Sequence, residues 1–429
     1  MTLLRDMHYP TPHELALAAR VLVDENPGPV RLRQVGASRA GQPLWVLSVD
    51  SCGTGAGAGA GRNVLVVAGA HANEPVGGAT VLSLARRLLR DPAPRAGCGW
   101  HFLLCADPDG AELHRTPRPY SLLDYHRNFF RPPGPEQPEW APSLLPPDRL
   151  PPETLALTAL IDELRPVLQV SLHATDLGGS WVQLTRDIPG LAEPFAKSAA
   201  ELHIPVENGA SDASGWPSPG PGIFVIPAPG TEAAGTFHPE ETRLSTWYHA
   251  HRYAGTTAIV EVPMWASDLV GDPAPHPDPR GALRVLAGRL TRDTALVSRV
   301  RDGIRPGPPP YGDPDAAALL RAVDWTLALI PRIALDWTGE GAPAEASAAY
   351  VASIDAFGRR LSLRAAAMLL RVLRARGDEA APGLDRLVTG WCEEFAARFQ
   401  ARWVPVATQV EHQSRTVLAT YERLAARSG

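Results

Sequence analysis

Two histidines and a glutamate, separated along the chain, have the setting needed to bind one divalent metal ion. His71 and Glu74 lie directly after an apolar run, Asn63–Ala68, which predicts a strand buried on both faces. His173 follows a second apolar run, Val167–Leu172. Because parallel strands present their carboxyl ends at one edge of a sheet, we expect the three side chains to meet there. Two imidazoles and one carboxylate leave an open position on Zn²⁺, as a hydrolytic site requires, so we predict one zinc ion per chain; Mn²⁺ and Co²⁺ accept the same ligands.

A further acidic residue, Glu261, lies within the apolar β-like run TTAIVEVP. A charged side chain in such a strand is costly unless it is paired or functional. A water molecule activated by zinc has to lose a proton, and the leaving amine has to gain one. We therefore expect Glu261 to be the general base. The structural alternatives are a glutamate on the solvent face of its strand and, for His71 and Glu74, an ordinary surface loop.

The elements that must position these residues alternate between strands and helices. The expected strands are Val30–Val35, Leu44–Val49, Asn63–Ala68, His101–Cys105, Val167–Leu172, Trp181–Leu184, Gly222–Ile226 and Thr256–Val262, and the expected helices cover residues 12–24, the stretch after Pro75 to about Arg90, and Glu153–Leu164. This alternation predicts an α/β fold, with a mixed, mostly parallel twisted sheet that has helices on both faces.

The composition of the chain changes after about residue 271. Proline-rich segments surround one short expected helix over 272–312, and beyond them the chain is rich in Ala, Leu and Arg, with apolar residues at three- and four-residue steps. We therefore expect a catalytic domain over 1–271, a linker with a short helix over 272–312, and an α-helical domain over 313–429.

Composition argues against several classes of protein. A formal net charge of −5, without a basic stripe, gives no reason to expect a nucleic-acid partner. No run of about 18 apolar residues is present, so we expect no membrane-spanning helix. The four cysteines are scattered, without a CxxC pair or the density of a disulfide scaffold. Since the amino terminus also has no basic segment leading into an apolar one, the expected location is cytoplasmic.

Six short segments in a fixed order resemble the zinc metallocarboxypeptidase superfamily, over roughly residues 8–265. They are YPTPHEL with the hairpin VRLRQVGASRAGQPLWVLSV, then GAHANEPVG, ADPDG, DYHRNF, SLHA and AIVEVP. In this family the second segment carries an HxxE zinc turn, SLHA supplies the third ligand, and the last segment carries the catalytic base. The resemblance implies a metallocarboxypeptidase-like fold for the first domain and leaves the last 150 or so residues without a counterpart.

The resemblance implies the same three metal ligands and the same base, with Glu261 acting later as a proton donor. In the ADPDG segment, Asp107 replaces the asparagine that is usual in the family. A flexible tyrosine that covers the substrate in the family has no clear counterpart, because Tyr248 and Tyr253 lie closer to Glu261 than the family spacing. We interpret both tyrosines as structural.

Two further functions are carried over from the family by position. Arg127 matches the arginine that binds the terminal carboxylate of the substrate, a task suited to a guanidinium because it meets a carboxylate with two parallel hydrogen bonds. His126 replaces the asparagine that precedes this arginine and can still donate a hydrogen bond. Arg118 is the best match for the arginine that polarises the scissile carbonyl, and Arg115 is the second candidate.

The chain is therefore expected to be a zinc metallocarboxypeptidase that cleaves a C-terminal peptide bond with metal-activated water. One alternative keeps the chemistry and changes the substrate, because HANEPVG and the D-x-x-R-x-F run also resemble the N-acyl amino acid deacylases of the aspartoacylase and succinylglutamate desuccinylase type. The opening hairpin favours the peptidase. Either substrate, a peptide or an N-acyl amino acid, carries a free carboxylate. A third hypothesis is a binding protein on this scaffold that has lost its metal. The retention of all the metal ligands argues against this hypothesis.

Overall fold

The computed structural model describes residues 8–52, 62–227, 241–304 and 314–426. Within these ranges, nine strands form one sheet. The strands are β1 (Val30–Ala37), β2 (Pro43–Val49), β3 (Arg62–Val67), β4 (Cys98–Leu103), β5 (Leu168–Gly178), β6 (Trp181–Leu184), β7 (Ile223–Val225), β8 (Thr256–Ala266) and β9 (Arg402–Trp403).

The sheet has parallel strands at its centre and antiparallel pairs on both sides of them, while β6 and β7 at one edge are again parallel. Its order is β1-β2-β4-β3-β5-β8-β6-β7, with β9 paired to β8. The strands β4, β3, β5 and β8 run parallel to one another. The pairs β1 with β2, β2 with β4, and β6 with β8 are antiparallel. The predicted mixed α/β sheet is therefore confirmed, and the carboxyl ends of β3, β5 and β8 lie at one edge, where ligands bind in such sheets.

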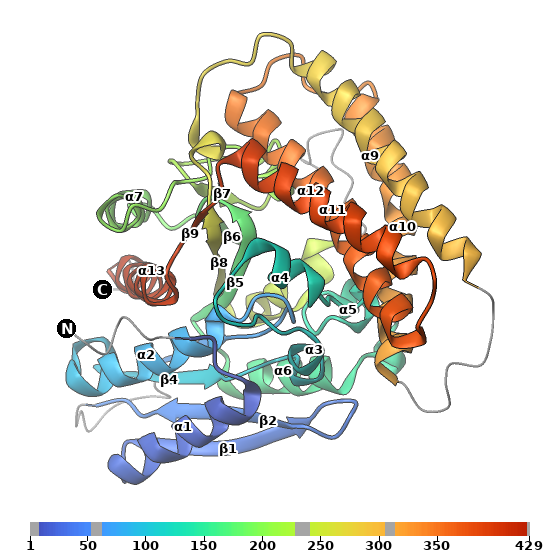
Figure 1. Ribbon diagram of the computed structural model, residues 1–429. Coiled ribbons are helices and arrows are strands. Elements are labelled where there is room, and N and C mark those ends of the chain that lie inside the picture. The colour runs from blue at the N-terminus through green and yellow to red at the C-terminus, as the bar shows by residue number, and fades with distance from the viewer. Residues whose placement is uncertain (1–7, 53–61, 228–240, 305–313, 427–429) are drawn as a thin grey trace.

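Helices cover both faces of the sheet (Figure 1). The helices of this part are α1 (Pro12–Glu25), α2 (Val76–Arg90), α3 (Pro108–Leu113), α4 (Leu122–Arg127), α5 (Ala141–Leu144), α6 (Pro152–Leu164), α7 (Ala192–Glu201) and α8 (Thr246–His249). Side chains of β3 alternate between two cores: Val64 and Val66 pack beneath α1, α2 and α7, whereas Leu65 and Val67 pack against α6. The face that α6 partly covers is the one that carries the candidate site.

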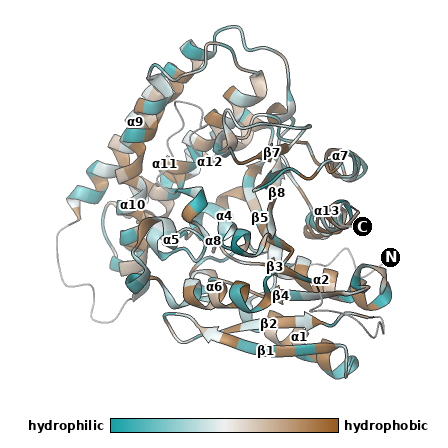
Figure 2. Ribbon diagram, turned by 180° about the vertical axis from the view of Figure 1, so that it is seen from behind, coloured by the Kyte–Doolittle hydropathy of each residue, from teal (hydrophilic) through white to brown (hydrophobic). Residues whose placement is uncertain are grey.

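The first four helices after residue 271 form a second layer beside this body, as Figures 1 and 2 show from opposite sides. They are α9 (Pro279–Gly303), α10 (Pro314–Thr338), α11 (Ala348–Arg376) and α12 (Ala381–Phe399), and the last helix, α13 (Val406–Ala425), lies apart from them. The first four pack against one another, and α11 and α12 also contact α4. None of the helices in the described ranges is both long and apolar enough to cross a membrane.

Two features of this region differ from the expected division of the chain. The helix expected to be short is α9, with 25 residues, and residues 305–313 of the expected linker lie outside the described residues. The last helix, α13, packs against α2, α7 and β8, while β9 pairs with β8. The end of the chain therefore returns to the α/β body, because the apolar face of α13 completes the core on the α2 side of the sheet. The predicted domain limits themselves stay predictions.

Candidate metal centre

The turn after β3 carries His71 and Glu74 with their side chains against each other. The backbone N–H of Glu74 donates to the carbonyl oxygen of His71 at 3.1 Å, which closes the turn just before α2. Nδ1 of His71 lies 3.0 Å from Oε1 of Glu74. His173, on β5, brings its Nδ1 to 3.0 Å from Nδ1 of His71 and 2.8 Å from Oε2 of Glu74. All three residues are buried. The structure thus brings the three predicted ligands together, with the two Nδ1 atoms facing each other.

Glu261 lies next to this cluster on the neighbouring strand. His173 and Glu261 are partners in the parallel pairing of β5 with β8, so their side chains project from the same face of the sheet. The adjacent Val260 points into the opposite core, beneath α2. Glu261 lines the same cavity as the three predicted ligands. The side chain of Glu261, although it belongs to an apolar strand, is therefore on the side of the sheet that faces the cavity.

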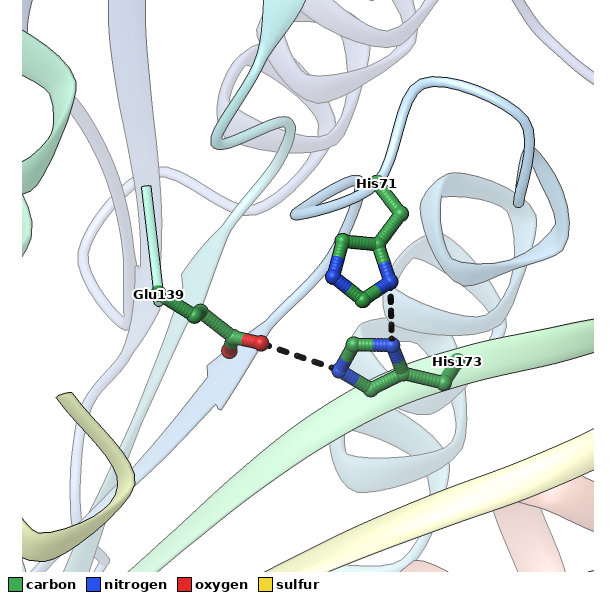
Figure 3. Close-up of side chains that lie close together, drawn as sticks. All are labelled: His71, Glu139 and His173. Atoms are coloured by element: carbon green, nitrogen blue, oxygen red, sulfur yellow. Dashed lines mark hydrogen bonds and ion pairs between the residues drawn. The ribbon is translucent and has the colours of Figure 1, made fainter. Parts of the chain in front are cut away.

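A second carboxylate, Glu139, lies on the other side of His173. Its Oε2 is 3.0 Å from Nε2 of His173, and its Oε1 accepts a hydrogen bond from the Ser171 hydroxyl at 2.5 Å. His71, Glu139 and His173 each offer a ligand atom, all within 4.8 Å of one another (Figure 3). Two carboxylates, Glu74 and Glu139, thus flank the histidine pair. No sequence signal pointed to Glu139, because it lies in a proline-rich segment with no strand or helix pattern.

Burial and mutual charge set the pKa values in the cluster. Burial lowers the pKa of His71 to about 4. Burial also acts to lower the pKa of His173, but Glu139 and Glu74 outweigh it and hold this pKa well above the ordinary value. Burial acts to raise the pKa of Glu74, but the two histidines outweigh it and hold this pKa well below the ordinary value. Burial, reinforced by the charge of Glu74, raises the pKa of Glu261 to about 8. The cluster thus contains an ionised carboxylate beside one that can hold a proton.

Among the described arginines, Arg131 is the one that contacts this cluster. Its Nη1 donates to Oε1 of Glu74 at 3.0 Å, and its Nη2 lies 3.0 Å from Nε2 of His71. Arg118 and Arg115, the two candidates from sequence, are both exposed, and neither lines the cavity. The structure therefore places a different arginine next to the cluster, two positions after the end of the DYHRNF segment.

The two residues expected to bind the substrate are engaged by other side chains. Arg127 donates from Nε to Asp385 at 3.1 Å and from Nη2 to Thr389 at 3.1 Å, and both partners are on α12. His126 is fully buried, with Nε2 3.4 Å from Oδ2 of Asp176. Neither Arg127 nor His126 lines the cavity. The resemblance to the family could not predict these contacts of Arg127, because α12 belongs to the part of the chain that has no counterpart in the family.

The two tyrosines interpreted as structural are also outside the cavity lining. The hydroxyl of Tyr253 donates to Oδ1 of Asp162 at 2.8 Å. The ring of Tyr248 packs against His251, with 4.5 Å between ring centroids.

The cavity has a volume of about 270 Å³ and is walled by both parts of the chain. The α/β body contributes the histidine and carboxylate cluster together with Arg131, Trp140, Trp181 and Trp247. The helical region contributes Trp325, Trp337, Tyr350, Phe357, Arg360 and Arg364. Apolar rings and two guanidiniums from α10 and α11 therefore face the cluster, and no sequence pattern predicted them.

Comparison with known proteins agrees with the motifs. Residues 18–178 match the family described as zinc carboxypeptidase. This region is zinc carboxypeptidase-like, and the resemblance that the motifs indicated is confirmed over these residues. No curated protein matches the chain in sequence.

Solved structures similar to the chain include two bacterial proteins. A metallo-carboxypeptidase from Burkholderia cenocepacia is 16% identical with a TM-score of 0.40, and the match covers 60% of this chain and 61% of that one. A chain from Shewanella amazonensis SB2B, which its name proposes to be a metallopeptidase, is 15% identical with a TM-score of 0.38, and the match covers 58% of this chain and 84% of that one. The chain thus spans less than two thirds of the first of these two proteins.

Proposed function

We propose that the chain is a zinc-dependent hydrolase that cleaves a C-terminal peptide or amide bond. The observation that carries this proposal is the convergence of His71, Glu74 and His173 in a cavity that Glu261 also lines. The similarity of residues 18–178 to zinc carboxypeptidases supports it.

The donor set fits zinc. Two imidazole nitrogens and a carboxylate, all buried and within hydrogen-bond distance of one another, are the ligands that Zn²⁺ takes in hydrolytic sites. We propose His71, Glu74 and His173 as the ligands of one ion per chain. Nε2 of His173 then donates to Glu139, in keeping with metal-binding histidines that give their second N–H to a carboxylate. When bound, zinc supplies a more acidic water molecule and a Lewis acid for the carbonyl oxygen.

Glu261 is the proposed general base. From its place beside His173 it can take a proton from the attacking water and later give it to the leaving amine. Its pKa of about 8 without a cation shows that burial and Glu74 favour the protonated form. A divalent cation in the cluster favours the carboxylate instead, because an opposite charge nearby lowers the pKa of an acid.

Arg131 is better placed than Arg118 or Arg115 to stabilise the negative charge that develops on the carbonyl oxygen. Its guanidinium already contacts Glu74 and His71, and it lines the cavity. Fixed donors at such a position act most strongly where water is excluded. We propose Arg131 for this function, whereas the expectation for Arg118, with Arg115 as the second candidate, stays a prediction from the resemblance.

The cavity supports short substrates. Its volume of about 270 Å³ is near the lower end of the roughly 300–1,000 Å³ that ligand pockets span. A blocked dipeptide or an N-acyl amino acid suits it better than a long peptide, since α10 and α11 form its far wall. Deacylation of an N-acyl amino acid is therefore the second candidate function.

Metal analysis combined with a substrate screen tests the proposal. We expect about one zinc ion per chain, hydrolysis of blocked dipeptides such as N-benzoylglycyl-phenylalanine, and loss of hydrolysis after treatment with a chelator. Glu261→Gln should keep the zinc and lose the hydrolysis. Cleavage of N-acetyl amino acids alone would favour the deacylase, whereas a protein without zinc that is indifferent to chelators would favour a binding function.

A further inference from the structure

Two arginines of α11 lie one helical turn apart at the cavity wall. Arg360 and Arg364 both line the cavity, and the i, i+4 spacing places them on the same face of the helix. Their side chains are only 12% and 15% exposed. Guanidiniums this far buried normally have anionic partners, because burying an unpaired charge is costly.

Among the residues that the structure describes, Asp176 alone forms ion pairs with both side chains. Nη1 of Arg360 lies 3.2 Å from Oδ1 of Asp176, and Nη2 of Arg364 lies 3.2 Å from its Oδ2. Glu207 and Asp212 add negative charge near Arg360, but Glu207 accepts its hydrogen bonds from Gly179 and Ser353 instead.

Both guanidiniums also keep an unused donor. The Nε atoms of Arg360 and Arg364 are buried and have no hydrogen-bond partner among the described residues. Leaving a buried donor without a partner is costly, and more so when the donor belongs to a charged group. A carboxylate supplied by a ligand would remove this cost, because it can accept two parallel hydrogen bonds from one guanidinium.

The arginine pair lies about one amino-acid residue away from the metal ligands. Nη1 of Arg360 donates to Oγ1 of Thr175 at 2.5 Å. Thr175 follows His173 by two positions on β5, so the two side chains share a face about 7 Å apart. Consecutive Cα atoms are 3.8 Å apart, so a substrate carbonyl at the cluster puts the carboxylate of the next residue within reach of α11. Arg127 cannot take this position while it is paired with Asp385.

We propose that Arg360 and Arg364 bind the free carboxylate of the ligand, so that the helical region selects substrates by their carboxyl terminus. The inference rests on the proposed function for the identity of the reaction, but it also predicts binding of small carboxylates independently of any reaction. Asp176 engages Nη1 of Arg360 and Nη2 of Arg364, which leaves other donors of each guanidinium for a ligand. The two arginines are thus binding and specificity residues.

Calorimetric titration with 3-phenylpropanoate and with 3-phenylpropanamide tests the binding. We expect the acid to bind about tenfold or more tightly than the amide, in keeping with charge-assisted hydrogen bonds. The preference should remain after zinc is removed with a chelator, which separates the arginines from coordination to the metal. The preference for the acid should nearly disappear in each of the single variants Arg360→Gln and Arg364→Gln, and it should persist in Arg127→Gln. No preference in the metal-free wild type, or a preference lost only in Arg127→Gln, would overturn the proposal.

Two variants guard against a merely structural effect. Arg364→Lys keeps the charge beside Asp176 and removes the planar pair of donors, so we expect at least a threefold loss of the acid preference with a thermal midpoint close to that of the wild type. Arg374→Gln, on the same helix and paired with Asp385 outside the cavity, should change nothing. An unchanged preference in Arg364→Lys and in a folded Arg364→Gln would contradict the proposal.

Kinetics separate this inference from the proposed function. With N-benzoylglycyl-phenylalanine, Arg364→Gln should raise KM about tenfold or more with a smaller change in kcat, and the corresponding C-terminal amide should be a poor substrate for the wild type. If the wild type hydrolyses neither compound, the proposed function fails while the binding result decides the inference by itself. If the wild type hydrolyses acid and amide equally, the inference fails and the proposed function stands.

Discussion

At the scale of single residues, His173 has a different partner on each ring nitrogen. Its Nδ1 faces Nδ1 of His71 and a carboxylate oxygen of Glu74, while its Nε2 faces Glu139, which Ser171 holds in place. A ring fixed on both sides keeps one orientation, and this fixes which nitrogen is offered to a metal. Glu74 is in direct contact with both histidines. Of the two histidines, Glu139 forms a hydrogen bond with His173 alone.

The different positions of Glu74 and Glu139 predict different effects on metal binding. Glu139→Gln should weaken zinc affinity about 10–100-fold, as loss of an outer partner does, and Glu74→Gln should weaken it much further because a ligand is lost. Competition with a chromogenic chelator measures both. Retention of zinc in Glu74→Gln together with its complete loss in Glu139→Gln would instead make His71, Glu139 and His173 the ligands.

Asp107 gives a prediction about the pH dependence of stability. Its Oδ1 accepts the backbone N–H of Gly110 at 2.9 Å, while its buried Oδ2 has no hydrogen-bond partner in the described part of the chain. Burial raises the pKa of Asp107 to about 7 from 3.8. A raised pKa means that the folded protein binds more protons, so Asp107 makes folding less favourable as pH rises from about 4 to 7. Relative to Asp107→Asn, the wild type should lose stability over this range, by at most about 4 kcal/mol.

Urea unfolding at several pH values measures this difference. The asparagine variant keeps the acceptor for Gly110 and cannot ionise. It should therefore differ from the wild type only in how its free energy of unfolding depends on pH. Parallel profiles for the two proteins would show that Asp107 has an ordinary pKa.

At the scale of elements, α13 supports the strand that carries His173. Gln413 donates to the carbonyl oxygen of His173 at 2.7 Å and accepts from the hydroxyl of Thr80, on α2, at 2.6 Å. His412, on the same helix, lies 2.8 Å from the hydroxyl of Ser180. A helix that is distant in sequence thus provides buried hydrogen bonds to the site-bearing part of the sheet.

Removing one of these bonds should destabilise the fold. Gln413→Ala removes the side-chain donor to the carbonyl oxygen of His173, leaves the Thr80 hydroxyl only its longer bond to the carbonyl oxygen of Val76 at 3.3 Å, and opens a small cavity. We therefore expect a loss of about 2–4 kcal/mol in the free energy of unfolding. Glu422→Ala, at an exposed position of the same helix, is the matched control and should change it by less than about 0.5 kcal/mol. Denaturant unfolding of both variants measures these changes in the free energy of unfolding. Equal losses in the two variants would mean that the hydrogen bonds of Gln413 are energetically unimportant.

At the scale of the whole molecule, the candidate site exists only when separate parts of the chain have assembled. The proposed ligands come from the turn after β3 and from β5, and α10 and α11 form the opposite wall of the cavity. The unfolded chain cannot present such a set, so metal binding must favour the folded state.

Zinc should therefore stabilise the folded protein. At a free zinc concentration about 1,000 times Kd, the expected gain is about 4 kcal/mol, seen as a rise in the thermal midpoint that a chelator reverses. The variant with both His71→Ala and His173→Ala should show no rise. A similar rise in this variant would place the stabilising zinc elsewhere in the molecule.

The sequence by itself determined the α/β body and the positions of His71, Glu74, His173 and Glu261. These residues follow or interrupt apolar strands, and the geometry of parallel strands brings such positions to one edge and one face. Local pattern is enough for that inference, because strand and turn signals depend on neighbouring residues.

Only the tertiary structure decided what surrounds them. Glu139 and Arg131 lie in segments without periodic pattern, and Arg360 and Arg364 reach the cavity only because α11 packs beside α4 and β5. The same packing engages Arg127 with α12. Contacts between segments hundreds of residues apart depend on how whole helices pack together, and no spacing within one segment records that.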